Sequence, residues 1–405
     1  MLPPSQSAPR QEGGSLKFAN RYAGYVVINP LMRGGILPQQ VREQLCSEGW
    51  LEIGYAVCHD CIEGRSSLIT KPPVREFLGQ VAEFFGGDEA EHTFGCRAAQ
   101  YVVMKTIAEH AKEEKLEPVV VTDPNSHYST NIAAEMVGLR VVEPPHTGYP
   151  EYRVTVEAFQ EKIEEVGRPA LVVATHADPY FGNIEPVEEL GRLCEELEVP
   201  FMVNAAYTAG VAPVDMKQMR ADFLTVSAHK SMASLAPLGF VVTTYEWSRR
   251  AFAPSKSKAE WTGRVFGKKL PNVFGCSIGG IPLISAMLSF EHVKSRVKHW
   301  EDEMKKTNRF VDRLEDIGEG DIMLLGERPK RHHLLHFETP LFWEISKKHK
   351  RRGFFLAEEM LKRRIVGLHK GLSKHIKLSV YGLSDEEADR VLEAFEEIAA
   401  LRERL

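Results

Sequence analysis

The sequence predicts an α/β protein, with a large domain built on a mostly parallel sheet and a smaller C-terminal α+β domain. Two observations carry this prediction. From Val74 to about Pro282, short apolar runs alternate with helical stretches, a pattern typical of βαβ units. Beyond Pro282 the alternation gives way to a long helical stretch and a basic region. We expect a disordered Pro/Ser/Gly-rich arm over residues 1–20, a large domain over 21–282 and a small domain over 283–405.

Each element of the large domain has its own signal. Helical periodicity covers residues 74–85 and stops at Gly86-Gly87, a C-terminal signal, and it returns at about 98–112. Further helices are expected at 131–136 and 187–197, and short strands at 22–28, 119–121, 171–174, 200–203, 223–226 and 239–242. Before them, the Gly- and Pro-rich loop 29–35 predicts unusual backbone dihedrals.

The C-terminal region predicts a different arrangement. A single long helix is expected over residues 283–314, followed by strands at 333–337 and 376–381. The chain closes with an amphipathic helix over 385–405, for which Ser384 is the expected N-cap.

Composition excludes several classes of protein. The chain has 405 residues, of which 43% are hydrophobic and 26% charged, as is ordinary for a soluble globular protein. Its apolar runs are too short for a membrane span. Because residues 1–14 lack an apolar stretch, we expect no secretory signal, a cytoplasmic location and reduced thiols for the six cysteines.

Charge is unevenly distributed along the chain. Residues 321–380 contain 14 Lys and Arg against 6 Asp and Glu, although the whole chain carries −5. Such asymmetry indicates a polyanionic partner, and a solvated face is the alternative. The region shows no ladder of aromatic residues for stacking on single-stranded RNA. The densest run holds Lys347, Lys348, Lys350, Arg351 and Arg352.

A lysine follows one of the buried strands. The run 223–226 ends in Ser227-Ala228-His229-Lys230. A lysine in this position can be partly desolvated, which lowers its pKa and suits it to Schiff-base formation. Ser227 and His229 can donate hydrogen bonds to a phosphate beside it. Taken alone, the motif also fits a surface lysine.

Other polar residues occupy comparable positions. Asn204 ends a second strand, and the carboxyl ends of strands in an open α/β sheet share one crevice, so Asn204 and Lys230 are expected to face each other. A small-residue turn before Arg97 and Ala98 opens a helix whose N-terminus favours an anion. His127 follows a strand and can stack on a planar ring. This ordered set predicts a pyridoxal-phosphate enzyme.

Three cysteines are candidates for sulfur chemistry. Cys58 and Cys61 form a Cys-x-x-Cys pair, which can bind metal, cycle as a disulfide or hold a persulfide. A zinc site would need a second such pair, which the sequence lacks. Cys276 lies among glycines that allow close approach to another backbone. Of the remaining cysteines, Cys46 and Cys194 are expected to be core residues, and Cys96 is expected to be structural within the turn before Arg97.

Together these motifs resemble the O-phosphoseryl-tRNA:cysteinyl-tRNA synthases, archaeal fold-type I pyridoxal-phosphate enzymes. The resemblance covers nearly all of the chain after residue 20. It is carried by residues 29–35, the Cys58/Cys61 pair, residues 95–98, 204–207 and 227–230, and Cys276. It implies a cytoplasmic homodimeric transferase that replaces the phosphate of O-phosphoseryl-tRNA(Cys) with sulfur, by elimination followed by addition.

The resemblance also implies roles for individual residues. Lys230 binds pyridoxal 5'-phosphate covalently and acts as general base, His127 lies on the ring, and Cys58, Cys61 and Cys276 handle sulfur. These three thiols hold either a persulfide or an iron–sulfur cluster. The other cofactor-binding residues are Arg97, Ala98, Asn204, Ser227, Ala228 and His229. Asn204 stands where most fold-type I enzymes have Asp, so it makes the cofactor a weaker electron sink.

The expected partners are anionic or deliver sulfur. They are tRNA(Cys) carrying O-phosphoserine, a sulfur donor and a phosphoseryl-tRNA synthetase. We expect residues 330–377 to contact the tRNA. Arg33 and Arg65 are candidate clamps for the substrate phosphate, with surface arginines as the alternative.

Three other functions remain open from the sequence. A cysteine desulfurase combines the same cofactor with a reactive cysteine, but usually has one loop cysteine and an Asp in place of Asn204. A sulfhydrylase acting on free O-phosphoserine would not need the basic region. A non-catalytic iron–sulfur or tRNA-binding protein would not need Lys230.

Overall fold

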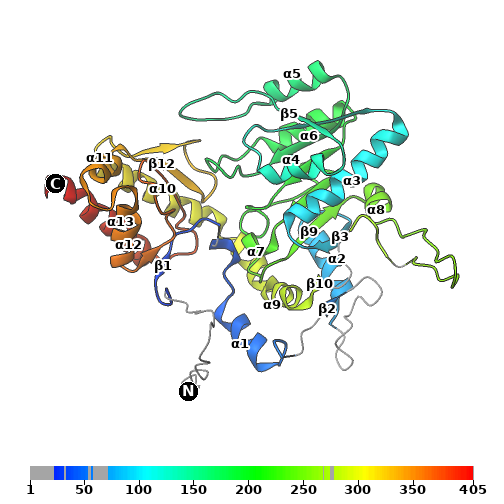
Figure 1. Ribbon diagram of the computed structural model, residues 1–405, viewed down its shortest axis with the longest axis horizontal. Coiled ribbons are helices and arrows are strands. Elements are labelled where there is room, and N and C mark those ends of the chain that lie inside the picture. The colour runs from blue at the N-terminus through cyan, green and yellow to red at the C-terminus, as the bar shows by residue number, and fades with distance from the viewer. Residues whose placement is uncertain are drawn as a thin grey trace.

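A seven-stranded sheet forms the centre of the protein. The computed structural model describes residues 22–31, 33–52, 56–57, 72–267, 269–273 and 278–404. The strand order is β3-β9-β8-β7-β6-β4-β5, with helices on both faces (Figure 1). The strands are β3 (Glu89–Thr93), β4 (Glu117–Thr122), β5 (Arg140–Val142), β6 (Pro169–Thr175), β7 (Phe201–Asn204), β8 (Phe223–Val226) and β9 (Gly239–Thr243).

The sheet is mostly parallel, as predicted. Strands β5, β4, β6, β7 and β8 pair in parallel, whereas β9 is antiparallel to both β8 and β3. The parallel strands therefore bring their carboxyl ends to one edge. Asn204, the last residue of β7, and Ser227, which follows β8, lie at this edge.

Two hydrophobic cores cover the two faces of the sheet. Along β6, Val172 and Ala174 belong to one core, and Leu171 and Val173 to the other. Because successive side chains point to opposite faces, a strand covered on both sides is a continuous apolar run. The helices are α1 (Gln39–Ser47), α2 (Val74–Phe84), α3 (Cys96–Glu114), α4 (Tyr128–Glu135), α5 (Val156–Val166), α6 (Val187–Glu196), α7 (Ala228–Ser231), α8 (Tyr245–Ala251) and α9 (Gly280–Val297).

The C-terminal region has a core of its own. An antiparallel sheet, β11-β12-β14, packs with helices α10 to α13 (Figure 1). Ser384 caps α13 through a capping box with Glu387, which confirms the predicted N-cap. The elements are α10 (Trp300–Gly318), β11 (Met323–Leu325), β12 (Leu335–Glu338), α11 (Pro340–Lys348), α12 (Phe355–Lys362), β13 (Ile365–Val366), β14 (His375–Leu378) and α13 (Asp385–Ala399).

The predicted single helix over residues 283–314 is wrong. Two helices, α9 and α10, meet at Lys298 and His299. Phe290 of α9 packs in a core of the large sheet, whereas Phe310 of α10 packs in the C-terminal core. The break lets each helix turn its apolar face to a different core.

The first described residues pack with the C-terminal region. Strand β1 (Val26–Val27), shorter than the predicted 22–28, pairs in parallel with β13. Val26 and Ile28 belong to the C-terminal core and are 5% and 0% exposed. Among the described helices, none is long and apolar enough to cross a membrane.

Candidate active site

Lys230 lies on a short helix that is held by close backbone packing. It belongs to α7, which begins directly after Ser227. A Cβ atom on Gly35 would lie 2.0 Å from the carbonyl oxygen of His229, and one on Gly34 would lie 2.7 Å from that of Lys230. These glycines are therefore required by contact with α7. The unusual dihedrals predicted for this loop are not observed at either glycine, because neither has a positive φ.

The N-terminus of α3 reaches the end of β7. The Cys96 thiol donates to Asn204 Oδ1 at 3.3 Å, and the Ala206 N–H donates to the same oxygen at 3.2 Å. Burial raises the pKa of Cys96 to about 11, so the thiol keeps its proton. With its oxygen occupied, buried Asn204 can offer a ligand only the hydrogens on Nδ2.

The amine of Lys230 is partly buried but can still react with a ligand. Burial lowers its pKa, and the nearby Cys96 opposes this effect. Lys230 Nζ lies 4.7 Å from the centre of the Tyr207 ring. In the part of the chain that the structure describes, no oxygen accepts a hydrogen bond from this amine. The sequence predicts no role for Tyr207, although its position three residues after Asn204 is a signal that it lies near the same site.

His127 caps a helix and also lies in the candidate site. It is the N-cap of α4, where its side chain accepts from the Ser129 N–H at 3.3 Å. Burial lowers the pKa of His127 to about 4, and the charges of Lys230 and Arg97 add to this effect. His127, Lys230 and Arg97 thus lie close enough to interact electrostatically, as the sequence predicted.

Ser227 and His229 lie between the strand end and the start of α3. A Cβ on Gly95, which has φ +102°, would lie 3.2 Å from His229 Cε1. His229 Nδ1 lies 2.8 Å from the Leu238 carbonyl oxygen, and Nε2 lies 3.5 Å from Ser227 Oγ. The Leu238 N–H also lies 3.3 Å from Nδ1, and when Nδ1 accepts from this group, Nε2 carries the proton and can donate to a phosphate.

Several predicted residues have other contacts or lie outside the described part. Arg33 donates to the carbonyl oxygens of Tyr381 and Val27, at 2.6 and 3.2 Å, and so ties the N-terminal loop to the C-terminal region. The sequence predicted no role for Arg296. Its guanidinium donates to the carbonyl oxygens of Gly34 and Ser231 and so joins the glycine loop to α7. Cys58, Cys61, Arg65 and Cys276 lie outside the described residues. The prediction that Cys46 is a core residue is wrong, because it lies on the exposed face of α1, whereas Cys194 is buried as predicted.

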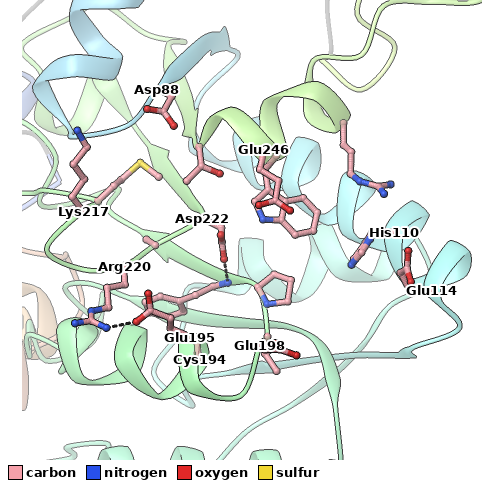
Figure 2. Close-up of a pocket in the computed structure, with 18 of the residues that line it drawn as sticks. Asp88, His110, Glu114, Cys194, Glu195, Glu198, Lys217, Arg220, Asp222 and Glu246 are labelled. Carbon is pink, nitrogen blue, oxygen red and sulfur yellow. Dashed lines mark hydrogen bonds and ion pairs between the residues drawn. The ribbon is translucent and has the colours of Figure 1, made fainter.

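A large cavity lies at the opposite edge of the sheet. It measures about 870 Å³ and is lined by Phe201 and Asp222, at the amino ends of β7 and β8. Figure 2 shows Asp222 accepting a hydrogen bond, which comes from the Phe201 N–H at 2.8 Å, and Arg220 paired with Glu195. This cavity is thus separated by the length of the strands from Asn204 and Lys230.

Comparison with known proteins decides the family. The aminotransferase class-V model matches residues 55–340. The chain is 44% identical over 382 residues to O-phospho-L-seryl-tRNA:Cys-tRNA synthase 2 of Archaeoglobus fulgidus, covering 93% of this chain and 94% of that protein. The chain belongs to the O-phospho-L-seryl-tRNA:Cys-tRNA synthase family. A second member, from Methanopyrus kandleri, is 41% identical, with 93% and 94% covered.

Solved structures agree with this assignment to the synthase family. A chain from the crystal structure of a SepCysS–SepCysE N-terminal domain complex superposes with a TM-score of 0.82 at 37% identity, covering 95% of this chain and 96% of that one. A cysteine desulfurase from Thermococcus onnurineus gives 0.73 at 19% identity, covering 93% and 95%. The second likeness shows the fold alone, which is fold-type I as predicted.

The described residues of this synthase-family member fit pyridoxal 5'-phosphate, the cofactor of class-V aminotransferases. The first turn of α3 leaves backbone N–H groups without intrahelical partners, which suits a phosphate. Lys230 supplies an amine that donates to no oxygen of another described residue, and Asn204 supplies amide hydrogens. No group of His, Cys, Asp and Glu among the described residues is arranged to hold a metal ion.

The structure changes the prediction for the basic region. Lys330 is 2% exposed and donates to the carbonyl oxygens of Phe181 and Gly182, both at 2.8 Å, so its assignment to the tRNA-contacting surface is wrong. Lys347 pairs with Glu344 at 2.6 Å, and Arg351 pairs with Glu358. Part of the positive charge counted in the sequence is therefore neutralised within the fold.

Proposed function

We propose that this chain converts O-phosphoseryl-tRNA(Cys) to cysteinyl-tRNA(Cys) by replacing phosphate with sulfur. The observation that carries this proposal is the meeting of Lys230, Asn204 and His127 at one sheet edge, in a chain whose relatives bear that enzyme's name over more than nine-tenths of their length.

We assign cofactor binding to the residues at this edge. The residues that would hold the phosphate of pyridoxal 5'-phosphate are Arg97 and Ala98 at the N-terminus of α3, with Ser227, Ala228 and His229. Asn204 would donate to the ring nitrogen through Nδ2, and His127 would lie against the ring. The bound cofactor withdraws electrons from the substrate Cα and so makes loss of the β-phosphate possible.

Lys230 is the proposed general base. Its lowered pKa raises the fraction of neutral amine, which can take the proton from the substrate Cα. Tyr207 lies against this amine and limits its access to water. The neutral ring of His127 adds no positive charge beside Lys230, which favours the same neutral state of the amine.

The sulfur-handling thiols are proposed to be Cys58, Cys61 and Cys276. Strand β2 (Ala56–Val57) ends one residue before Cys58, and β10 (Ile278–Gly279) begins two residues after Cys276. These two strands are paired antiparallel, with Val57 opposite Ile278. This pairing supports a common thiol site, which would hold either a persulfide or an iron–sulfur cluster.

The partners are proposed from the relatives. The substrate is tRNA(Cys) carrying O-phosphoserine, delivered by a phosphoseryl-tRNA synthetase, and a separate donor supplies sulfur. One related chain was crystallised with the N-terminal domain of SepCysE, which supports a protein partner here. We further propose a cytoplasmic homodimer. Because α9 packs with the large sheet, the proposed domain boundary moves from near residue 282 to the break at Lys298 and His299. We propose tRNA contacts by Lys348, Lys350 and Arg352, which form no ion pair with another described residue.

Absorbance spectroscopy tests the cofactor assignment. We expect anaerobically purified protein to absorb at about 410–430 nm, with the band lost on borohydride reduction and absent from Lys230→Ala. Additional broad brown absorbance would favour the cluster over the persulfide. Protein that stays colourless when pyridoxal phosphate is added would contradict the proposal.

Phosphate release tests the substrate. Wild-type protein with a sulfide source should release phosphate from O-phosphoseryl-tRNA(Cys) and form cysteinyl-tRNA. Equal kcat/KM with free O-phosphoserine would favour the sulfhydrylase. Release of sulfide or alanine from free cysteine, without phosphate release, would favour the desulfurase.

A further inference from the structure

Five aromatic side chains from separate parts of the chain meet beside the candidate active site. Tyr149 and Tyr152 lie between β5 and α5, Tyr180 and Phe181 follow β6, and His336 lies on β12. We call these five residues the aromatic shelf. No aromatic ladder was evident in the sequence, because the shelf is assembled only when the large sheet and the C-terminal sheet come together.

The shelf is a continuous set of ring contacts. Tyr152 and Phe181 are stacked, with centroids 4.1 Å apart and planes 6° from parallel. Phe181 and His336 are stacked at 5.4 Å and 14°. Tyr149 lies 6.3 Å from Tyr152, with the rings edge to face.

The outer rings of the shelf are accessible. Tyr149 is 58% exposed and Tyr180 is 44% exposed. Lys377 Nζ lies 5.1 Å from the centre of the Tyr180 ring and donates to the Pro179 carbonyl oxygen, which fixes a cation beside that ring. Lys374 pairs with Glu338 at 3.9 Å, and the Tyr149 hydroxyl donates to the same carboxylate at 3.2 Å, so Lys377 rather than Lys374 supplies the positive charge beside the rings. Exposed rings beside a lysine suit nucleobases joined by phosphates.

The shelf is connected to the active site by a hydrogen bond. Asn125 Nδ2 donates to the Tyr152 carbonyl oxygen at 2.8 Å, and His127 follows Asn125 by two residues. The loops that carry Tyr152 and Phe181 begin at the carboxyl ends of β5 and β6. Asn204 ends β7 at this same edge of the sheet. A ligand on the shelf would therefore lie next to the proposed reaction site.

We propose that the aromatic shelf binds single-stranded RNA by base stacking and so positions the 3' end of the aminoacylated tRNA. This inference rests on the proposed function, because it takes a tRNA as the substrate. The amino acid of any aminoacyl-tRNA is esterified to the 3' terminal nucleotide, which belongs to a single-stranded end. Unpaired bases in such an end can stack on tyrosine, phenylalanine and histidine rings.

A short RNA binding assay tests the shelf directly. The probe is a fluorescein-labelled single-stranded RNA of eight nucleotides ending in CCA, titrated with the cofactor-loaded full chain. We expect Tyr180→Ala and Tyr149→Ala each to weaken binding by about 5- to 150-fold, the range for loss of one base–aromatic stack. Tyr180→Phe, which keeps the ring, should bind as the wild type does.

Matched controls separate stacking from general effects. Tyr245 is 57% exposed but begins α8 at the opposite edge of the sheet, so Tyr245→Ala should bind RNA normally. The loss caused by Tyr180→Ala should be similar at 50 and 200 mM salt, because stacking releases few counterions. Every variant must retain the wild-type absorbance of bound pyridoxal phosphate, which reports an intact site.

Turnover distinguishes failure of the shelf from failure of the proposed function. With O-phosphoseryl-tRNA(Cys), Tyr180→Ala should raise KM and leave kcat near the wild-type value. Wild-type turnover with unchanged KM in both alanine variants would overturn the shelf but not the function. Equal losses in Tyr180→Phe or Tyr245→Ala would also overturn it. If the wild type shows no turnover but its RNA binding still depends on the Tyr180 ring, the proposed function is refuted and the shelf is not.

Discussion

Asn204 is a buried amide whose hydrogen bonds determine which of its atoms can bind a ligand. Its oxygen accepts from the Cys96 thiol and the Ala206 N–H, so only Nδ2 is free to act on a ligand. An amide donor leaves a pyridine nitrogen without a proton, whereas a carboxylate would keep the nitrogen protonated. In the proposed site, the weaker electron sink would still allow a good leaving group to be expelled but would hinder transamination.

We expect Asn204→Asp to strengthen electron withdrawal and to open side reactions. During turnover the variant should slowly convert its bound cofactor to the amine form, seen as loss of absorbance at about 410–430 nm and of activity. Cys96→Ser keeps a donor to residue 204 and should not show this loss. An Asn204→Asp protein that reacts cleanly and as fast as the wild type would contradict our interpretation.

His127 allows its cap and its ring to be tested separately. His127→Ala should lose the hydrogen bond to the Ser129 N–H and about 1 kcal/mol of stability, whereas His127→Asn should keep the cap. Both variants lose the stacking ring, so both should bind pyridoxal phosphate more weakly. Thermal unfolding and cofactor titration distinguish these effects, and equal stability of the two variants would refute the capping role.

The lowered pKa of His127 also predicts a pH dependence. The folded state holds the ring neutral, with a pKa of about 4 against an unfolded value of about 6.5. Protons therefore bind the unfolded state more readily between these values. The free energy of unfolding should fall as pH decreases from 6.5 to 4, more steeply in the wild type than in His127→Asn. Parallel pH profiles from denaturant titrations would count against the buried neutral ring.

Residue types and strand-end positions were predictable at this scale, but their partners were not. Lys230, Asn204 and His127 could be identified because each follows a strand-like run. The contact between Cys96 and Asn204 joins residues 108 apart in sequence. Such a contact depends on the order of strands in the sheet, which apolar patterns do not specify.

At the scale of elements, the active-site helix α7 is held by backbone contacts. The segment that contains Gly34 and Gly35 packs against it, and Ala233 N–H donates to the Gly34 carbonyl oxygen at 3.0 Å. Arg296 of α9 donates to the carbonyls of Gly34 and Ser231 and so joins the two segments. Three separate stretches of chain thereby fix the position of Lys230.

We expect Gly35→Ala to displace α7. The new Cβ would clash with the His229 carbonyl oxygen, and overpacking of this kind costs about 1–3 kcal/mol. Cofactor affinity should fall together with thermal stability. Gly79→Ala is the matched control, because its Cβ meets nothing within 4 Å in helix α2 and should stabilise by about 0.5–1 kcal/mol. Normal cofactor binding in Gly35→Ala would refute the close packing.

Elements with strong apolar patterns were predicted well, and polar ones were not. The predicted strand 223–226 matches β8, and the helix predicted over 74–85 is α2. Strand β3 was missed because its sequence, Glu-Ala-Glu-His-Thr, has only one apolar residue. Glu91 and His92 are nevertheless buried there, and Arg75 pairs with Glu91 at 3.1 Å. Tertiary partners make this strand possible, and local sequence does not report them.

Across the whole molecule, the N-terminal segment and Lys330 are among the connections that join the large sheet to the C-terminal region. Strand β1 and Arg33 reach the C-terminal core from the start of the chain. Lys330 reaches back to the loop at Phe181 and Gly182, where burial lowers its pKa to about 8. Neither connection could be predicted from the sequence, because both depend on how distant segments pack.

The N-terminal connection should control the stability of the C-terminal core. Ile28 is fully buried there, and Ile28→Ala should cost about 2–5 kcal/mol. Hydrogen exchange should accelerate first in β13 and α12 rather than in the large sheet. Ile36→Ala, at a 46% exposed site in the same segment, should leave exchange unchanged. Uniform acceleration across both regions would show instead that the molecule unfolds as one unit.

The pairing of Val26 with Ile365 has a consequence for how the protein is made. At about 5–20 residues per second, the ribosome completes β13 roughly 20 to 70 s after β1. Throughout that interval β1 has emerged but has no strand to pair with, and Val26 and Ile28 have no core to enter. A chain that terminates before residue 365 keeps this apolar segment uncovered at its N-terminus. An incomplete chain would therefore expose Val26 and Ile28, and exposed apolar surface of this kind makes a partly made chain prone to aggregation.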